Sequence, residues 1–333
     1  LTLVGEAMGR TPGVLGRFFQ ALGAVGVSVH ATGQGASSRS ISCVISAADT
    51  PVAVRTVHAA FNFAHQRVNA FVLGKGVVGR ELLAQIHGQT ARLRDDHDVD
   101  LRVAGIADSQ RAIFDEGGVD LANWSEGLKQ SDTDPDVEAL LDRLCRLPVP
   151  VLVDCSAADG QEALYRAAFE RGIHVVAANK KPLAIAWTER EELMATARRY
   201  HRSYHYETTV GASLPIIETL KNLVRTGDVV RHIEGAFSGT LGYLCNELMG
   251  GCPISSAVRR AKELGYTEPN PQDDLSGLDV ARKALILARE LGYAVELSDV
   301  EVKPLVAAEL LAPKTAEGFL EDLKGVDAST AAD

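Results

Sequence analysis

The chain has 333 residues, of which 46% are hydrophobic and 23% are charged, and its net charge is −10. This length predicts two or three domains with packed cores, and the composition excludes a disordered or collagen-like chain. Acidic and basic residues are interspersed, so the sequence lacks the concentrated positive charge that nucleic acid requires, and we expect no nucleic-acid partner.

Residues 1–67 predict a small α+β domain. Alternating apolar and polar residues indicate its strands, and apolar residues at helical spacing indicate its helices. Thr11 and Pro12 offer an N-cap and a proline at the start of the first helix. The predicted elements, in chain order, are strand 1–6, helix 11–22, strands 27–32 and 40–46, and helix 51–61.

Residues 68–205 predict a dinucleotide-binding domain. The apolar run Ala70–Leu73 leads into the turn GKGVVG at 74–79 and then into an amphipathic helix at 80–86, an order typical of the Rossmann fold. Strands at 101–107, 149–153 and 174–178 alternate with helices at 137–144 and 161–171. This alternation predicts an α/β, doubly wound parallel sheet. The polar stretches 89–100 and 131–134 predict loops.

Residues 206–333 break the alternation and predict an α+β domain for substrate binding or dimerisation. Its predicted elements are helix 214–225, strand 229–237, a glycine-rich turn at 238–242, and helices 254–264 and 278–291.

The glycine motif has a specific physical purpose. Gly74 turns the chain, Gly76 lets the backbone approach a pyrophosphate, and Gly79 lets the helix pack on the strand. The alternative is a glycine-rich turn without a ligand. The strand before the motif and the helix after it favour a dinucleotide. Asp108 would suit the ribose of NAD, whereas Ser109 and Arg111 could hold the 2′-phosphate of NADP.

A second motif combines acidic residues with a lysine. Asp279 and Lys283 lie four residues apart on a predicted helix, hence on one face, and Glu268 precedes them in a loop. This spacing alone is compatible with a surface ion pair. It is also compatible with a carbonyl-reducing site, in which a lysine ammonium protonates the alkoxide that hydride transfer produces and carboxylates hold a substrate amine.

These residues carry a family resemblance. Residues 265–283 (GYTEPNPQDDLSGLDVARK), 206–216 (YETTVGASLPI), 237–241 (FSGTL) and 179–181 (NKK) closely resemble homoserine dehydrogenase. Upstream, residues 34–42 and the run into the glycine turn resemble the last ACT domain of the bifunctional aspartokinase/homoserine dehydrogenases. The resemblance covers nearly the whole chain.

The resemblance implies roles for individual residues. Lys283 would be the proton donor, Asp279 and Glu268 would bind the substrate amine, and Asp274 and Lys180 would also lie at the substrate. Further implied cofactor contacts are Gly74, Gly76, Val77, Val78, Gly79, Ser156, Lys180 and Gly265. A structural sodium ion would be bound by Glu207, Val210, Ala212 and Leu214. Oxygen donors from an irregular loop suit an alkali cation rather than zinc. A tight hinge between domains is the alternative for that loop.

The resemblance also implies partners. Gln34 matches a threonine-binding position of ACT domains, although a polar residue after a strand can simply form a turn. We expect a homo-oligomer, either a dimer or a tetramer. Because the chain begins at Leu1 inside a predicted strand, and because family members continue beyond its Ala-rich end, we expect a fragment of a longer enzyme.

Other features exclude whole classes of site and location. No apolar run could span a bilayer and no signal peptide is recognisable, so we expect a cytoplasmic protein without a membrane partner. The cysteines are odd in number and never spaced as CxxC, which argues against a disulfide framework or a thiolate zinc site. Cys155 has no His–Asp arrangement to activate it, so we interpret it as a packing residue.

The leading hypothesis is therefore an NAD(P)-dependent homoserine dehydrogenase. It would reversibly reduce L-aspartate 4-semialdehyde to L-homoserine in threonine, methionine and isoleucine biosynthesis, as part of a bifunctional aspartokinase/homoserine dehydrogenase. One alternative is an amino-acid-sensing ACT module joined to a catalytically incomplete nucleotide fold. Another is a different amino-acid dehydrogenase that uses the same glycine turn.

Overall fold

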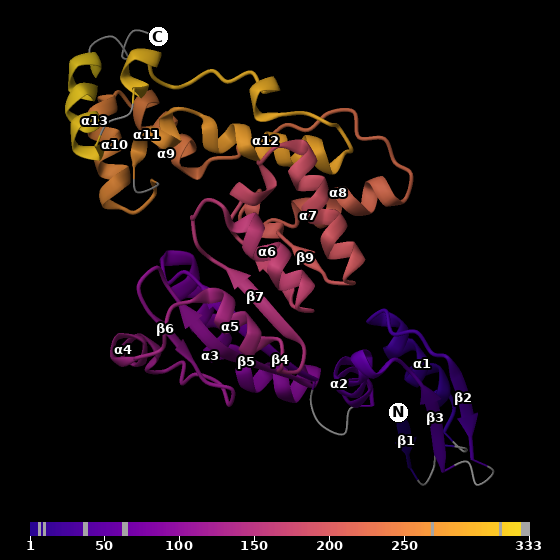
Figure 1. Cartoon of the computed structure of the whole chain (residues 1–333). Coiled ribbons are helices and arrows are strands. Elements are labelled where there is room, and N and C mark those ends of the chain that lie inside the picture. The colour runs from indigo at the N-terminus through magenta and orange to yellow at the C-terminus, as the bar shows by residue number, and fades with distance from the viewer. Residues whose placement is uncertain are drawn as a thin grey trace. The chain divides into compact units, whose positions relative to one another are not determined.

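The computed structural model describes residues 1–5, 8, 11–35, 39–61, 66–267, 270–312 and 315–327 (Figure 1). The chain divides into two compact units. The first comprises Leu1–Asn179 and Glu191–Tyr206, and the second comprises Lys180–Arg190 and Glu207–Asp333.

A three-stranded antiparallel sheet with two helices forms the N-terminal part of the first unit (Figure 1). Its elements are β1 (Thr2–Val4), α1 (Val14–Ala24), β2 (Ala31–Gln34), β3 (Ser40–Val44) and α2 (Thr50–Ala60), and β3 is the central strand. The predicted order of strands and helices is confirmed. The second strand begins four residues later than predicted, because the ladder with β3 covers residues 31–34.

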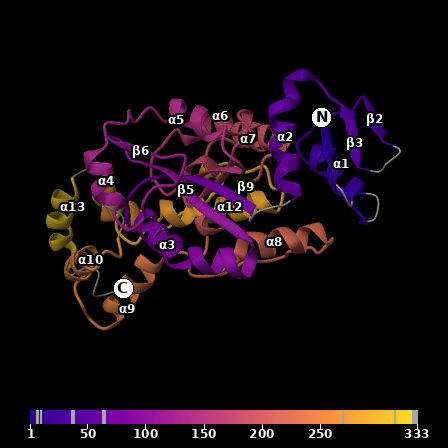
Figure 2. The ribbon, with the colours of Figure 1, turned by 90° about the horizontal axis from the view of Figure 1, so that it is seen from below.

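The core of this small sheet lies between β3 and the two helices. Ile41 and Cys43 are buried while their neighbours are not, since successive side chains of a strand point to opposite faces. They pack with Phe18 and Leu22 of α1 and with Val57 of α2. The two helices also contact each other (Figure 2). They therefore cover the same face of the sheet.

A six-stranded sheet forms the larger part of the first unit, in the spatial order β6-β5-β4-β7-β8-β9. Neighbouring strands are parallel except β6, which is antiparallel to β5. The strands are β4 (Gln66–Leu73), β5 (Val99–Ala107), β6 (Ala112–Phe114), β7 (Pro150–Asp154), β8 (His174–Ala177) and β9 (Tyr204–His205). The prediction of an α/β fold with a parallel, doubly wound sheet is confirmed.

The strand order locates the functional edge of this sheet. In this order β4 lies between β5 and β7. The chain therefore continues from β4 to β5 on one side, and later forms β7 on the other side of β4. In such sheets, ligands bind beyond the carboxyl ends of the strands at this switch point. The glycine turn at 74–79 directly follows β4. The fold therefore positions the turn where a dinucleotide binds in proteins of this architecture.

The helix after the glycine turn is longer than predicted. It is α3 (Val77–His97), and residues 89–97, which we predicted as part of a loop, form its last turns, so that prediction was wrong. The stretch contains neither proline nor glycine, and Arg92 and Asp96 form an i,i+4 ion pair on it. Its polarity reflects a helix surrounded by solvent rather than a loop.

Further helices accompany the large sheet. Helix α5 begins and ends at the predicted residues, and the side chain of Asp136 accepts hydrogen bonds from the backbone of Glu138 and Ala139 at its N-terminus. Helix α6 also matches its prediction to within one residue, whereas α4 and α7 were not predicted. Their bounds are α4 (Trp124–Gln130), α5 (Val137–Leu144), α6 (Gln161–Glu170) and α7 (Trp187–Arg199).

The second unit is mainly helical in its described part. Its helices are α8 (Ile216–Arg225), α9 (Gly239–Met249), α10 (Ile254–Glu263), α11 (Pro271–Leu275), α12 (Leu278–Glu290) and α13 (Ala316–Leu323). One hydrophobic cluster joins α9, α10 and α13 through Leu244, Val258 and Phe319, all fully buried.

Two predictions for the second unit were wrong. Residues 229–237 form no strand within the described chain, because an alternating pattern makes a strand only where a neighbouring backbone supplies hydrogen bonds. The glycine-rich stretch 238–242 is the start of α9 rather than a turn. The side chain of Ser238 accepts a hydrogen bond from the backbone N–H of Leu241 at 3.1 Å and so caps that helix.

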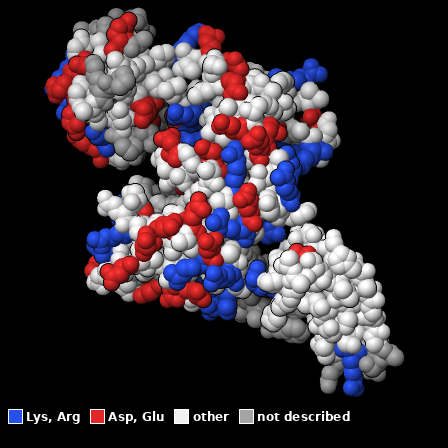
Figure 3. Space-filling model, in the orientation of Figure 1, with Lys and Arg blue, Asp and Glu red and all other residues white. Residues whose placement is uncertain are grey.

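The surface carries mixed charge. Figure 3 shows acidic and basic side chains interspersed over much of the visible face, with few charges on the N-terminal sheet and its helices. Across the residues that the structure describes, no helix is both long enough and apolar enough to cross a membrane.

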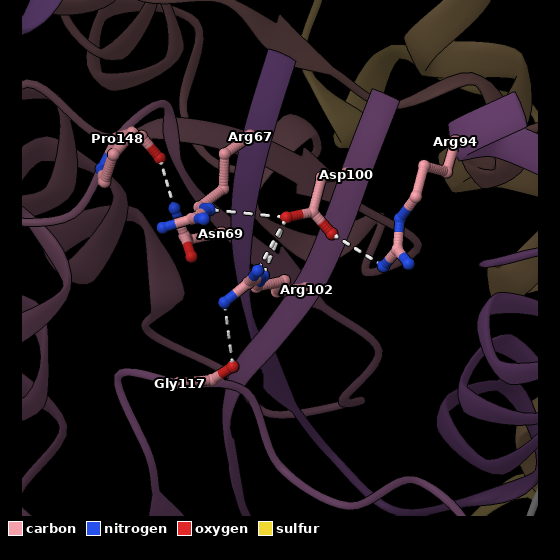
Figure 4. A network of polar contacts seen from close by, with 7 residues as sticks. All are labelled: Arg67, Asn69, Arg94, Asp100, Arg102, Gly117 and Pro148. Atoms are coloured by element: carbon pink, nitrogen blue, oxygen red, sulfur yellow. Dashed lines mark hydrogen bonds and ion pairs between the residues drawn. The ribbon is translucent and has the colours of Figure 1, made fainter. Parts of the chain in front are cut away.

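A buried carboxylate ties together the starts of β4 and β5 (Figure 4). Asp100 accepts hydrogen bonds from the guanidinium groups of Arg67 at 3.3 Å, Arg94 at 3.3 Å and Arg102 at 2.8 Å. Burial alone would raise the pKa of Asp100. The hydrogen bonds and charges of the arginines, Arg102 first, outweigh it and hold the pKa below its ordinary value. Asp100 is therefore charged at neutral pH.

Replacing Asp100 by Asn should lower the free energy of unfolding by about 1–3 kcal/mol at pH 7, since three guanidinium groups lose their carboxylate partner. The folded pKa lies below the unfolded value of 3.8, so this contribution is complete above that value and is lost as the pH falls through the folded pKa. Urea unfolding at pH 7 and pH 3 should therefore show a larger difference between wild type and variant at pH 7.

The exposed pair of Lys129 and Glu126 provides the control. Glu126→Gln should change the free energy of unfolding by less than about 1 kcal/mol at either pH. An Asp100→Asn effect that is equal at both pH values would contradict the assigned role.

Candidate active site

The glycine turn after β4 makes very close backbone contacts. Gly74 has φ +91°, and a Cβ on it would lie 2.9 Å from backbone atoms of Cys155 and Ser156. A Cβ on Gly79 would lie 1.9 Å from the carbonyl oxygen of Gly74. Only glycine fits either position. These contacts bring Ser156, a predicted cofactor residue, beside the turn.

The middle of the turn is open. Apart from Gly76 itself and its two chain neighbours, no heavy atom of the described chain lies within 4 Å of the position that a Cβ on Gly76 would occupy. The next two residues, Val77 and Val78, begin α3 and are 80% and 52% exposed. An open glycine followed by a helix N-terminus fits the approach of a pyrophosphate, because that end of a helix favours anions.

The residue after β5 is held by three donors. One carboxylate oxygen of Asp108 accepts from the backbone N–H groups of Gln110 at 2.7 Å and Arg111 at 2.8 Å, and the other forms an ion pair with Lys75. Burial raises the pKa of Asp108, but the hydrogen bonds from Lys75 and the backbone outweigh it and lower the pKa overall. Sequence reasoning missed Lys75, which occupies an unspecified position of the glycine motif.

Asp154, at the end of β7, is a fully buried hub that the sequence did not reveal. Its carboxylate accepts hydrogen bonds from the Tyr165 hydroxyl at 2.5 Å, the Asn179 side chain at 3.2 Å and the Ser156 backbone at 2.7 Å. A buried carboxylate needs such partners. Asp154 therefore orients both Ser156 and Asn179, the residue that precedes Lys180 in the chain.

A carboxylate and two lysines form a compact cluster in the second unit. One oxygen of Asp279 lies 2.7 Å from Nζ of Lys180, and the other lies 2.6 Å from Nζ of Lys283. Lys283 also donates to the backbone carbonyl of Phe237 at 2.7 Å. Asp279 and Lys283 share one face of α12, as their spacing predicted. The surface ion-pair alternative does not describe them, because both side chains are at most 16% exposed.

The charges in this cluster are mutually dependent. Burial would raise the pKa of Asp279, but hydrogen bonds from Lys180 and then Lys283, together with their charges, lower it overall. The carboxylate is therefore ionised at neutral pH. One aspartate between two lysine ammonium groups leaves a net positive charge, which favours an oxyanion nearby.

The segment that carries Lys180 is anchored to α12. Arg289, which is 2% exposed, donates to the backbone carbonyls of Leu183 at 2.9 Å and Ile185 at 2.7 Å. A second buried contact joins Arg190 to Glu290 at 2.6 Å. These contacts explain how Lys180 reaches Asp279 although the two residues are far apart in sequence. No spacing pattern predicted them.

The other predicted substrate and cofactor residues of the second unit are Asp274, Gly265 and Glu268. Asp274 is buried on the short helix α11. Gly265 has φ +74° and follows α10, where its N–H donates to the carbonyl of Lys262 at 3.0 Å, so it terminates that helix. Glu268 lies outside the described residues.

The loop predicted to bind sodium is tightly folded. Glu207 accepts hydrogen bonds from the backbone of Ile217 at 2.8 Å and Glu218 at 2.9 Å, so its carboxylate caps α8. Gly211 and Ala212 have left-handed backbones with φ of +83° and +53°. Val210 is buried and Leu214 is exposed. Within the described residues, no group of three or more His, Cys, Asp or Glu side chains could hold a metal ion.

Gln34, the predicted threonine-binding residue, is the last residue of β2. It is exposed and pairs with Ile41 in the register of the small sheet. The geometry is compatible with ligand binding and equally with a turn-forming role.

Three family descriptions match consecutive parts of the chain. An ACT domain matches residues 1–61, a homoserine dehydrogenase NAD-binding domain matches residues 74–207, and the homoserine dehydrogenase domain matches residues 215–331.

Relatives extend this result. A homoserine dehydrogenase of Schizosaccharomyces pombe is 35% identical over 79% of this chain and 73% of its own length. The bifunctional aspartokinase/homoserine dehydrogenase 1 of Arabidopsis thaliana is 40% identical over 98% of this chain. The chain spans only 36% of that protein. Among solved structures, a hyperthermophilic archaeal homoserine dehydrogenase in complex with NADPH is 28% identical with a TM-score of 0.57, over 67% of this chain and 69% of its own.

Cys155 should react slowly with thiol reagents. Burial, and then the negative charge of Asp154, raise the pKa of its thiol to about 11. At pH 8 only about one molecule in a thousand should carry the reactive thiolate. Limited alkylation with iodoacetamide, followed by peptide mass spectrometry, should label exposed Cys245 well before Cys155. Equal labelling rates in the folded protein would contradict the packing role.

Proposed function

The chain belongs to the homoserine dehydrogenase family, and we propose that it catalyses the reversible NAD(P)-dependent reduction of L-aspartate 4-semialdehyde to L-homoserine. The single observation that carries this proposal is the buried cluster in which Asp279 bridges Lys180 and Lys283. A carbonyl reduction needs a group beside the carbonyl oxygen that stabilises the developing alkoxide and donates a proton to it, and a lysine ammonium in this cluster can do both.

The proposed chemistry divides between the cofactor and the chain. A bound nicotinamide supplies the hydride that reduces the aldehyde carbon. The Lys283 ammonium donates a proton to the resulting alkoxide, which completes the alcohol. In the reverse direction, the neutral amine of Lys283 accepts the hydroxyl proton. Asp279 keeps Lys283 in place through the 2.6 Å contact, and the Phe237 carbonyl holds the same ammonium at 2.7 Å.

Substrate orientation is proposed to use the same carboxylate. Each oxygen of Asp279 already accepts from one lysine, but a carboxylate offers about four acceptor positions. The remaining positions would accept from the substrate amine, together with Glu268, and Asp274 would line the same site. Lys180 would contact both substrate and cofactor.

The nucleotide is proposed to be NADP(H), with NAD(H) as the alternative. The close approach at Gly74 and Gly79 and the open position at Gly76 support a pyrophosphate over the N-terminus of α3. Val77, Val78, Ser156 and Gly265 would complete the contacts. The archaeal relative in complex with NADPH supports this class of cofactor.

A sodium ion is proposed at the loop that contains Glu207, Val210, Ala212 and Leu214. One carboxylate and three backbone carbonyls are hard oxygen donors, which suit an alkali cation. Because the Glu207 carboxylate caps α8, a bound cation would share it with that helix.

Regulation and assembly form a further part of the proposal. We propose that the chain is the dehydrogenase part of a bifunctional enzyme, that it assembles as a homo-oligomer, and that its ACT domain binds threonine at Gln34. The match of an ACT domain to residues 1–61 supports ligand sensing. It equally supports an alternative in which the chain is a sensing module without turnover. Calorimetry with threonine and NADP⁺ beside an activity assay separates the two, since ligand binding without activity favours the module.

Lys283→Ala should lower kcat for aspartate semialdehyde reduction by between about 100-fold and 10,000-fold, the range for loss of a general acid. The assay is NADPH oxidation by the full-length protein that contains this chain. Binding of NADPH, measured separately, should persist, since Lys283 acts on the substrate oxygen.

Lys303→Ala is the matched control, because that lysine belongs to the same unit and is 89% exposed. It should leave kcat unchanged. Near wild-type turnover in a folded Lys283→Ala variant would defeat the proton-donor assignment.

A further inference from the structure

A lysine inside the glycine turn contacts the acidic residue at the position that binds the adenosine ribose in this fold class. Lys75 occupies the second position of the turn, directly after Gly74, and Asp108 directly follows β5. The two side chains form an ion pair. An acidic residue at this place usually accepts hydrogen bonds from the ribose hydroxyls of NAD. Here that residue has a cationic partner from the turn itself.

The ion pair involves the carboxylate oxygen that would be most available to a ribose. One oxygen of Asp108 already accepts from the backbone of Gln110 and Arg111, which leaves the other oxygen as the more available acceptor. Lys75 forms its ion pair with that oxygen. The oxygen keeps a further acceptor position, but the ammonium neutralises the carboxylate charge and so weakens the bond that an uncharged ribose hydroxyl could make there.

The local charge also favours an anion. Lys75 and Arg111 contribute two positive charges and Asp108 contributes one negative charge, so the turn and the 108–111 loop are positive overall. The Lys75 side chain is 48% exposed, and its ammonium has two further donors beyond the ion pair. Arg111 is exposed, and its backbone N–H is held by Asp108. A phosphate group carries between one and two negative charges at neutral pH.

We propose that Lys75 determines cofactor choice: by neutralising Asp108, it converts a ribose-reading carboxylate into part of a 2′-phosphate site, so that the protein prefers NADP(H) to NAD(H). This inference rests on the proposed dinucleotide function and names the residue that sets its specificity. Asp108 acts as a positioning residue that holds the ammonium of Lys75 and the backbone of Arg111 on one side of the site.

The test measures binding rather than turnover. Calorimetry on the full chain compares adenosine 2′,5′-bisphosphate with 5′-AMP, and NADP⁺ with NAD⁺, because each pair differs only in the 2′-phosphate. Wild type should bind the 2′-phosphorylated member at least about tenfold more tightly. Lys75→Met should reduce this ratio by about tenfold or more, by weakening the 2′-phosphorylated ligands while leaving 5′-AMP and NAD⁺ as tight or tighter.

Two further variants sharpen the test. Asp108→Asn keeps an amide oxygen that can still accept a hydrogen bond at this place and removes only the negative charge, so the preference for the 2′-phosphate should remain. Lys129→Ala, at an exposed lysine on α4 of the same unit, should leave every affinity unchanged.

The outcomes separate this inference from the function beneath it. An unchanged ratio in Lys75→Met, or a wild type that binds both members of each pair equally, would overturn the role of Lys75 while leaving dinucleotide binding intact. If neither NADP⁺ nor NAD⁺ binds to the folded wild type, the proposed dehydrogenase function fails instead.

Discussion

The geometry of the first unit depends on how closely the turn after β4 can approach the loop after β7. A side chain at Gly74 or Gly79 would collide with backbone atoms. The lack of a side chain at these two glycines therefore lets the strand, the helix and the neighbouring loop approach one another closely. The buried Asp154 also fixes this loop, because its carboxylate accepts hydrogen bonds from the backbone N–H of Ser156 and from the side chain of Asn179. The position that a Cβ on Gly76 would occupy nevertheless stays open beside this close packing.

The second unit holds two lysine ammonium groups close to one carboxylate in a largely buried cluster. Asp279 forms a close ion pair with each lysine, and these two partners offset the cost of burying its carboxylate. Arg289 stabilises the arrangement from a distance, since it binds the carbonyls of the segment that carries Lys180. The cluster is thus held by backbone anchoring as much as by its own charges.

The sequence predicted the features that depend on interactions between residues close together in the chain. The glycine turn and the spacing of Asp279 and Lys283 depend on a few neighbouring residues, so both could be inferred from the sequence. Lys180 reaches the same site through tertiary contacts, and only the family resemblance indicated it. Residues 89–97 and 229–237 were misassigned because polarity does not exclude a solvated helix and alternation does not supply a strand partner. The tertiary partners that no spacing indicated are Lys75, Asp154 and Arg289.

The arginine cluster around Asp100 lies at the start of β5, whereas the glycine turn follows the end of the neighbouring parallel strand β4. The arginine cluster and the proposed cofactor site therefore lie at opposite ends of the parallel strands of one sheet. Because the two sites lie at opposite ends of the strands, a substitution near Asp100 that changes the free energy of unfolding need not alter the residues around the glycine turn. Stability at acidic pH and affinity for the cofactor could then be changed separately in this protein.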